Sequence, residues 1–174
     1  MTRGMPDAGP GALIDLFVGA IKLDRETYRR VAGRPESTRL CIAIVLLSGL
    51  AHGAVLTMRW GPAGGPIIGI ASAFASLGLS SGLVWLIGAV LLRYPSGFGS
   101  IVRPLAIATA PALFNLVGAL TLVRPVVLVV SAWLLAAFMV AVRAALDCGR
   151  LVALGVTLAT WAVELSMYYY ALRD

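Results

Sequence analysis

Long apolar segments, each bounded by arginine, dominate the chain from residue 39 to its end. The bounding residues are Arg39, Arg59, Arg93, Arg103, Arg124, Arg143, Arg150 and Arg173. The apolar segments themselves contain one ionisable acid, Glu164. A helix needs about 20 apolar residues to cross the hydrocarbon core of a bilayer. The pattern therefore predicts a protein that lives in a membrane.

The apolar segments predict an all-α membrane protein with a bundle of five transmembrane helices over residues 39–174. The expected helices cover residues 40–58, 66–92, 104–123, 125–142 and 151–172. Pro111 lies inside the third of them, where it leaves the carbonyl of Ile107 without its backbone donor. We expect the third helix to bend there.

The residues before the first span form two further segments. Residues 1–10 are rich in glycine and proline, which predicts a flexible N-terminus. Residues 11–38 form a cytoplasmic segment in which apolar residues recur near helical spacing among cations. These apolar residues are Leu13, Phe17, Ile21, Tyr28 and Val31. This segment predicts one or two short amphipathic helices in the membrane interface, the second capped by Asp24, and the alternative is a solvated linker.

The cationic residues predict how the helices thread through the membrane. Cytoplasmic loops of membrane proteins carry an excess of Lys and Arg. With the N-terminus inside, only Arg59, Arg124 and Arg173 of the 14 cationic residues lie outside. We therefore expect an N-in, C-out topology. The strong preference for Arg over Lys, with abundant Ala and Gly, indicates a multi-pass protein of a bacterial cytoplasmic membrane.

Composition agrees with a membrane location and bears on whether the chain binds nucleic acid. Hydrophobic residues make up 60% of the chain and charged residues 13%, with a mean hydropathy of +0.93. Soluble domains carry about 25% charged residues. A net charge of +6 can indicate nucleic-acid binding, but here the arginines follow the helix ends, so topology explains them and we expect no nucleic-acid partner. Cys41 and Cys148 are expected to be unpaired thiols.

Three polar residues are predicted to lie in one layer of the membrane. His52, Asn115 and Glu164 lie about 18, 17 and 20 Å along the first, third and fifth helices, which run in the same direction. One interpretation is hydrogen bonding between helices, in which Glu164 accepts from Asn115 or His52. A second is a functional pocket that handles protons or binds a small molecule or lipid head. A third places these side chains toward lipid.

Signatures of catalysis and of metal binding are missing, so we expect no enzyme, no metal and no catalytic residues. The chain has no HExxH, GxSxG or Walker motif. Ser48 lies one turn before His52, a spacing that favours a hydrogen bond over a catalytic dyad. His52 is the single cofactor candidate, because small neighbours such as Gly49 and Gly53 leave room for a tetrapyrrole beside an imidazole ligand.

Two further sets of residues are candidate contact sites. Small residues of the second helix recur at helical spacing and predict a packing face, because small side chains let helices approach closely in lipid. This face comprises Gly65, Gly69, Ser72, Ser76, Gly78 and Gly82. Arg103, Arg143 and Arg150 of the inner loops are candidates for contact with anionic lipid heads. The alternative for Arg143 is an ion pair with Asp147 on the helix surface.

Four segments carry a resemblance to a known family: Leu23-Asp24 with Tyr28, and residues 103–111, 132–134 and 142–146. In these segments the chain resembles the Ypt-interacting protein (Yip) domain family, in its bacterial branch. The resemblance implies a cytoplasmic N-terminus and five membrane helices. Eukaryotic members associate with Rab GTPases, but their Asp-Leu-Tyr-Gly-Pro motif is replaced here by Asp-Leu-Phe-Val-Gly at residues 15–19. No catalytic residues are known for the family, so the resemblance implies none.

These observations together favour a non-enzymatic membrane protein. The first hypothesis is a scaffold or accessory subunit of a larger membrane complex or homo-oligomer, in contact with lipid and other membrane proteins. Its basis is the short chain, the small-residue packing faces and the lack of a catalytic constellation. The alternative is a small transporter, or an ion- or proton-coupled carrier, that uses the layer of His52, Asn115 and Glu164.

Overall fold

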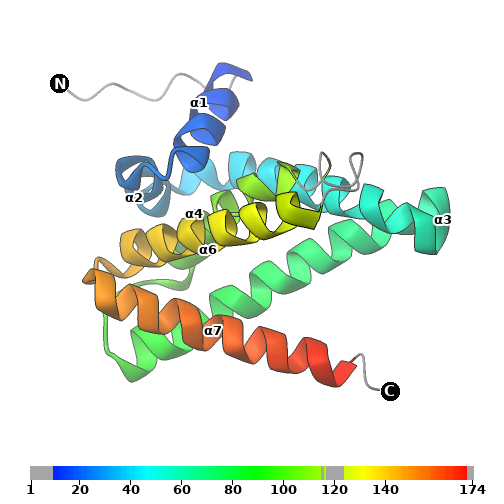
Figure 1. The fold of residues 1–174 in the computed structure, drawn as a ribbon. Helices are drawn as coiled ribbons and strands as arrows, with labels where there is room; N and C mark the ends of the chain where they lie inside the picture. Colours follow the sequence, from blue (N-terminus) through cyan, green and yellow to red (C-terminus); the bar gives the residue numbers. More distant parts are fainter. Residues whose placement is uncertain (1–9, 115, 117–123, 172–174) are drawn as a thin grey trace.

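A computed structural model describes residues 10–114, 116 and 124–171, and every regular element in that part is helical (Figure 1). In order, the elements are α1 (Pro10–Ile21), α2 (Arg25–Gly33), η1 (Pro35–Ser37), α3 (Thr38–Val84), η2 (Trp85–Leu91), α4 (Phe98–Ile107), η3 (Ala110–Phe114), α6 (Arg124–Leu146) and α7 (Arg150–Ala171). Within the described residues, three stretches are long and apolar enough to cross a membrane: Pro35–Thr57, Gly61–Leu91 and Val129–Leu146.

Helix α3 is a hairpin of two antiparallel helices (Figure 1). We call the stretch Pro35–Thr57 the first arm and the stretch Gly61–Leu91, which includes the π-helix η2, the second arm. The chain reverses at Gly61, where φ is 77° and ψ is 170°. A side chain makes this conformation unfavourable, so glycine is the residue that fits. The reversal is therefore tighter than the predicted loop between residues 58 and 66.

The two arms touch through their backbones. Gly65 and Gly69 of the second arm are buried against Gly53 and Gly49 of the first. A Cβ atom on Gly65 would lie 2.7 Å from the carbonyl oxygen of Gly53 and from the backbone nitrogen of Thr57. Gly65 and Gly69, two residues of the predicted packing face, therefore pack against the first arm.

The other half of the predicted face does not pack within the chain. A Cβ atom on Gly78 or Gly82 would meet nothing within 4 Å, and Ser72 and Ser76 are exposed. Ser72 and Ser76 instead line a cavity that is described below. Packing of Gly78 and Gly82 against other helices stays a prediction.

Helix α4 begins earlier than the predicted third span. Its first residue is Phe98, after Gly97 at the N-cap position, so Pro104 lies inside the helix rather than at its start. The helix ends at Ile107 and the chain continues as the 3₁₀-helix η3, which contains Pro111. The sequence predicts a bend within one helix, whereas the structure ends the α-helix four residues before Pro111, whose missing N–H cannot donate to the carbonyl of Ile107.

The last two helices agree with the predicted spans to within a few residues. Helix α6 continues to Leu146 rather than ending at residue 142, and α7 begins at Arg150. The turn between them contains Asp147, whose φ is 48°. Residues 117–123 of the predicted third span, and residues 1–9 and 172–174, lie outside the described residues.

The N-terminal helices pack against the bundle. Tyr28 is fully buried, Val31 is 1% exposed, and both belong to one apolar core with Ile101 and Leu105 of α4. Burial raises the pKa of Tyr28, so the phenol stays protonated and donates to the carbonyl of Ala20 at 3.2 Å. Two helices form as predicted, and the apolar stripe of α2 contacts the bundle. A protein surface satisfies such a stripe as well as lipid does.

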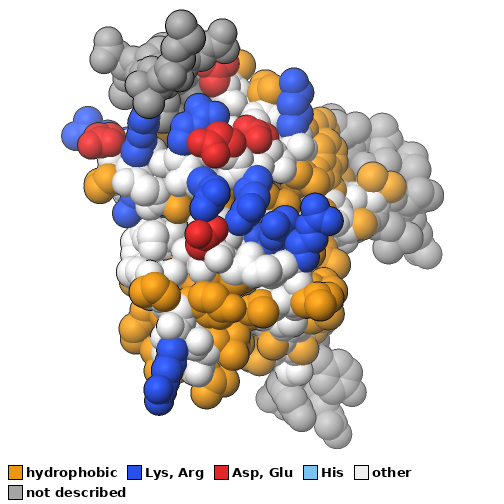
Figure 2. Space-filling model, turned by 90° about the vertical axis from the view of Figure 1, so that its left-hand side faces the viewer, with side chains coloured by type: hydrophobic (Ala, Val, Ile, Leu, Met, Phe, Trp, Pro, Cys, Tyr) orange, Lys and Arg blue, Asp and Glu red, His pale blue; other side chains and the backbone are white. Residues whose placement is uncertain are grey.

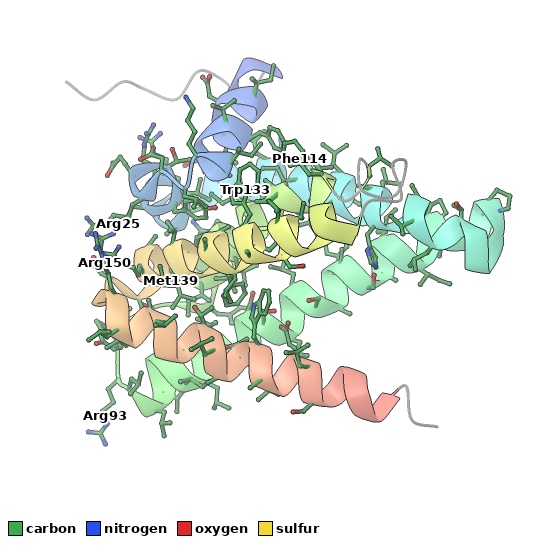
Figure 3. All side chains as sticks on the ribbon, viewed as in Figure 1. Arg25, Arg93, Phe114, Trp133, Met139 and Arg150 are labelled. Carbon is green, nitrogen blue, oxygen red and sulfur yellow. The ribbon has the colours of Figure 1, made fainter. Side chains whose placement is uncertain are left out.

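Aromatic contacts tie α1 to α6. Trp133 of α6 donates from its indole nitrogen to the carbonyl of Ile21, at the end of α1, over 3.1 Å. The ring of Trp133 also stacks on Phe114 of η3, with centroids 5.4 Å apart (Figure 3). The C-terminal end of α1 is therefore held against α6 by this hydrogen bond.

Asp24 caps α2 as the sequence predicts. Its carboxylate accepts from the backbone nitrogens of Glu26 and Thr27, at 3.2 Å each, and from the Thr27 hydroxyl at 2.6 Å. The hydrogen bond from the Thr27 hydroxyl is the main reason why the pKa of Asp24 lies below its ordinary value of 3.8. A carboxylate also favours the positive end of the helix.

Replacing Asp24 with alanine is expected to cost about 1 kcal/mol of α2 stability at neutral pH. Because the folded pKa is lowered, this stabilisation is complete above the ordinary pKa of 3.8 and disappears as the pH falls through the folded value. Hydrogen–deuterium exchange of the α2 amides measures the effect. Equal exchange rates in Asp24→Ala and the parent at pH 7 would contradict the cap.

Cationic side chains gather at the end of the bundle where α2 meets the turn between α6 and α7. Figure 2 shows this face, with acidic side chains among the cations. Arg25, Arg93 and Arg150 lie along this same edge (Figure 3). Asp147 pairs here with Arg25 at 3.2 Å and Arg29 at 2.8 Å, both from α2. The alternative of an Arg143–Asp147 pair is corrected: the positive φ of Asp147 turns it out of the α6 surface toward α2.

Candidate functional site

A cavity of about 480 Å³ lies where the two arms of α3, the α4–η3 segment, α6 and α7 meet. Its wall is mostly apolar and carries a few polar side chains. The lining residues are Ser48, His52, Ser72, Ala73, Ser76, Leu77, Ser80, Leu105, Ala108, Thr109, Ala112, Leu134, Phe138, Trp161 and Glu164. A volume of this size and a wall of this kind are typical of small-molecule sites.

Glu164 is the acid of this cavity. It lies 14 residues after Arg150, or about 21 Å along α7 from the cationic end of the bundle. Ser80 of the second arm donates a hydrogen bond to its carboxylate. Trp161, one turn earlier on α7, lines the same cavity because residues three apart share a helix face.

Hydroxyl groups cover one side of the cavity. Ser72, Ser76 and Ser80 recur every four residues on the second arm, so they share one helix face. On the first arm, Ser48 donates to the carbonyl of Thr109 over 3.0 Å. That hydrogen bond joins the first arm to the residue where α4 gives way to η3. The partner of Ser48 is thus the carbonyl of Thr109, whereas the sequence analysis expected a hydrogen bond with His52.

The structure brings two of the three predicted polar residues to the same cavity. His52 and Glu164 both line it, while Asn115 lies outside the described residues. Ser80 of the second arm donates to Glu164, a donor that the sequence analysis did not predict, and the predicted hydrogen bond from Asn115 stays a prediction. The sequence signal for Ser80 is its four-residue spacing from Ser72 and Ser76, with which it forms a serine row. The sequence analysis assigned Ser72 and Ser76 to helix packing.

The cavity opens to the surface beside the arms of α3. His52, Ser72 and Ser76 line it and are exposed in the chain.

Among the described residues, no three His, Cys, Asp or Glu side chains converge as metal ligands. No protein-family model, curated protein or solved structure matches this chain. The resemblance to Yip-domain proteins therefore rests on the sequence segments alone. The chemistry of the site follows from its own residues: one carboxylate, one imidazole, several hydroxyls and two aromatic rings.

The arginines that were candidates for lipid contact fall into different environments. Arg103 donates to the carbonyls of Val31 and Ala32, at 3.4 and 2.9 Å, so it binds the C-terminal end of α2. A cation stabilises that end of a helix. Arg143 is half-buried and its Nε is buried without a partner, whereas Arg150 is exposed. Arg103 is therefore corrected to an internal contact.

Proposed function

We propose that this chain is a non-enzymatic integral membrane protein that acts as a scaffold or accessory subunit of a larger membrane complex. The observation that carries the proposal is the poor coverage of the second arm. Only 22% of its most apolar window is buried within the chain, against 39% for each of the other two candidate spans. Most of this helix is thus available to lipid or to a helix of another subunit.

The uncovered side of the second arm has the chemistry of a helix-pairing surface. Ala71, Ala75, Gly78 and Gly82 recur at alternating spacings of four and three residues. This is the repeat of a left-handed helix pair, and small residues allow the close approach on which association in lipid depends. Nothing in the described chain lies within 4 Å of a Cβ on Gly78 or Gly82. A second copy or another membrane protein would supply the missing helix.

The proposed setting is a bacterial cytoplasmic membrane, crossed five times with the N-terminus inside. The gathering of Arg25, Arg93 and Arg150 at one end of the bundle supports this threading, because those residues precede or join different helices (Figure 3). Arg143 and Arg150 would then lie at the level of anionic lipid heads.

Purification of the tagged chain from its own host in mild detergent is expected to yield a complex with another membrane protein or a second copy. Native mass spectrometry measures the assembly. Gly78→Leu should release the partner because its side chain prevents close helix approach, whereas Gly155→Leu, at an equally open glycine on α7, should retain it. A monodisperse monomer from the parent chain would contradict the proposal.

The cavity favours a carrier as the second candidate function, because an acid inside the membrane is a common element of ion-coupled transport. Proton uptake by liposomes that contain the protein separates the two functions. Uptake that Glu164→Gln abolishes, in a variant that still folds, would replace the scaffold proposal with the carrier. Absence of uptake leaves the scaffold as the function that the geometry supports.

A further inference from the structure

Glu164 has no cationic partner among the described residues. The ion pairs in that part of the chain are Arg25–Asp147, Arg29–Asp147 and Arg30–Glu26, all of them in the N-terminal helices and the α6–α7 turn. The lining of the cavity contains no Lys or Arg. A carboxylate has acceptor sites for about four hydrogen bonds, and Ser80 fills one of them. The cavity therefore presents an acceptor group that the described chain leaves largely unmatched.

Two aromatic rings line the same cavity. Trp161 comes from the helix that carries Glu164, and Phe138 comes from α6. The faces of aromatic rings attract cations, Trp most strongly, and the attraction grows when water is excluded. A carboxylate beside two aromatic rings in an apolar cavity is thus suited to a positively charged group.

We propose that this cavity binds a lipophilic organic cation: a molecule with one ammonium-type or comparable positive charge on an apolar body. The charge would lie beside Glu164, between Trp161 and Phe138. The apolar body would lie against Leu77, Leu105 and Leu134, which line the rest of the cavity. Hydroxyls of the serine row accept hydrogen bonds from any N–H groups of the ligand. This inference goes beyond the scaffold role and does not depend on it.

The lining disfavours other ligands. A divalent metal ion would require more ligands than one carboxylate and one imidazole, and no third metal-binding side chain joins them in the described residues. A phospholipid head carries a phosphate, which Glu164 would repel and which no Lys or Arg in the lining would neutralise. A site that bound only a proton would not need a cavity of about 480 Å³.

The position of the opening agrees with this class of ligand. The exposed lining residues His52, Ser72 and Ser76 belong to the two arms of α3, which are candidate membrane spans. A lipophilic cation partitions into the bilayer, whereas a small hydrated cation does not. The ligand would reach Glu164 from the lipid side without crossing the cationic end of the bundle.

The test is binding of tetraphenylphosphonium to the intact chain in phosphatidylcholine nanodiscs, measured by equilibrium dialysis. Tetraphenylborate has the same shape and the opposite charge, so it serves as the matched probe. We expect saturable binding of the phosphonium and no saturable binding of the borate. Glu164→Gln should lower phosphonium affinity at least about tenfold, while Glu36→Gln, at an exposed acid outside the cavity, should leave it unchanged.

Two further variants show whether a loss of affinity in Glu164→Gln comes from the missing charge or from misfolding. Glu164→Asp keeps the charge and should retain most of the affinity, and Ser76→Leu should weaken binding by filling the cavity while the charge remains. The proposal is overturned if the parent binds no phosphonium, if it binds borate equally well, or if Glu164→Gln or Ser76→Leu binds like the parent. A chain that binds no other membrane protein would still bind the phosphonium. The scaffold proposal and the cation-binding proposal can therefore be contradicted separately.

Discussion

Replacing Gly69 with alanine is expected to destabilise the protein by about 3 kcal/mol or more, because the new methyl group has no space. The atoms that it would meet are the carbonyl oxygen of Gly49 and the backbone nitrogen and Cα of Gly53. Backbone atoms cannot rotate away as the end of a side chain can. The two arms of α3 would have to separate, and the close contact along the hairpin would be lost.

Unfolding in mixed micelles with increasing dodecyl sulfate measures this loss as a change in the free energy of unfolding. Gly78→Ala is the matched control, since the same methyl group would meet nothing within 4 Å there. That variant should be as stable as the parent, or more stable by up to about 1 kcal/mol, because alanine favours helix more than glycine does. Equal destabilisation by the two substitutions would contradict the hairpin packing.

Replacing Tyr28 with alanine is expected to detach α1 and α2 from the bundle. The side chain is fully buried in the apolar core, and removal of a buried aromatic side chain costs about 3–5 kcal/mol. Trypsin cleavage after Arg29 and Arg30 measures the detachment, because the protease needs α2 to open. A loss of 3 kcal/mol corresponds to cleavage faster by about 100-fold or more.

Two comparisons make the Tyr28 result specific. Cleavage after Arg93, in the exposed segment before α4, gives an internal reference that should not change. Tyr28→Phe keeps the ring and loses only the hydrogen bond to Ala20, which is worth about 1 kcal/mol, so its cleavage should rise about tenfold or less. If Tyr28→Ala were cut no faster than the parent, α2 would not be held by this side chain.

The sequence predicts local features of this protein well. Apolar length indicated the long helices, Pro111 indicated an irregularity close to the end of α4, and Asp24 indicated the start of α2. Each of these depends on atoms within one helical turn or on the length of one segment. The start of α4 at Phe98 was missed because Pro104 is a helix-start signal that also occurs inside helices.

The candidate site was only partly predictable. Depth along parallel helices placed His52 and Glu164 in one layer, and both line the cavity. Depth says nothing about rotation of a helix around its axis, so Ser80 was not identified as the donor to Glu164. For the same reason, the sequence did not indicate that Gly78 and Gly82 face away from the other described helices.

The sequence by itself determined that this chain is helical, that its helices are apolar enough for a membrane, and that a single acid lies deep in one of them. These properties follow from composition and spacing along one chain. Only the tertiary structure decided which small residues touch, that α2 lies on the bundle, and that Glu164 faces a cavity. Those outcomes depend on how helices rotate and cross, and the free energy of packing between distant segments determines that arrangement.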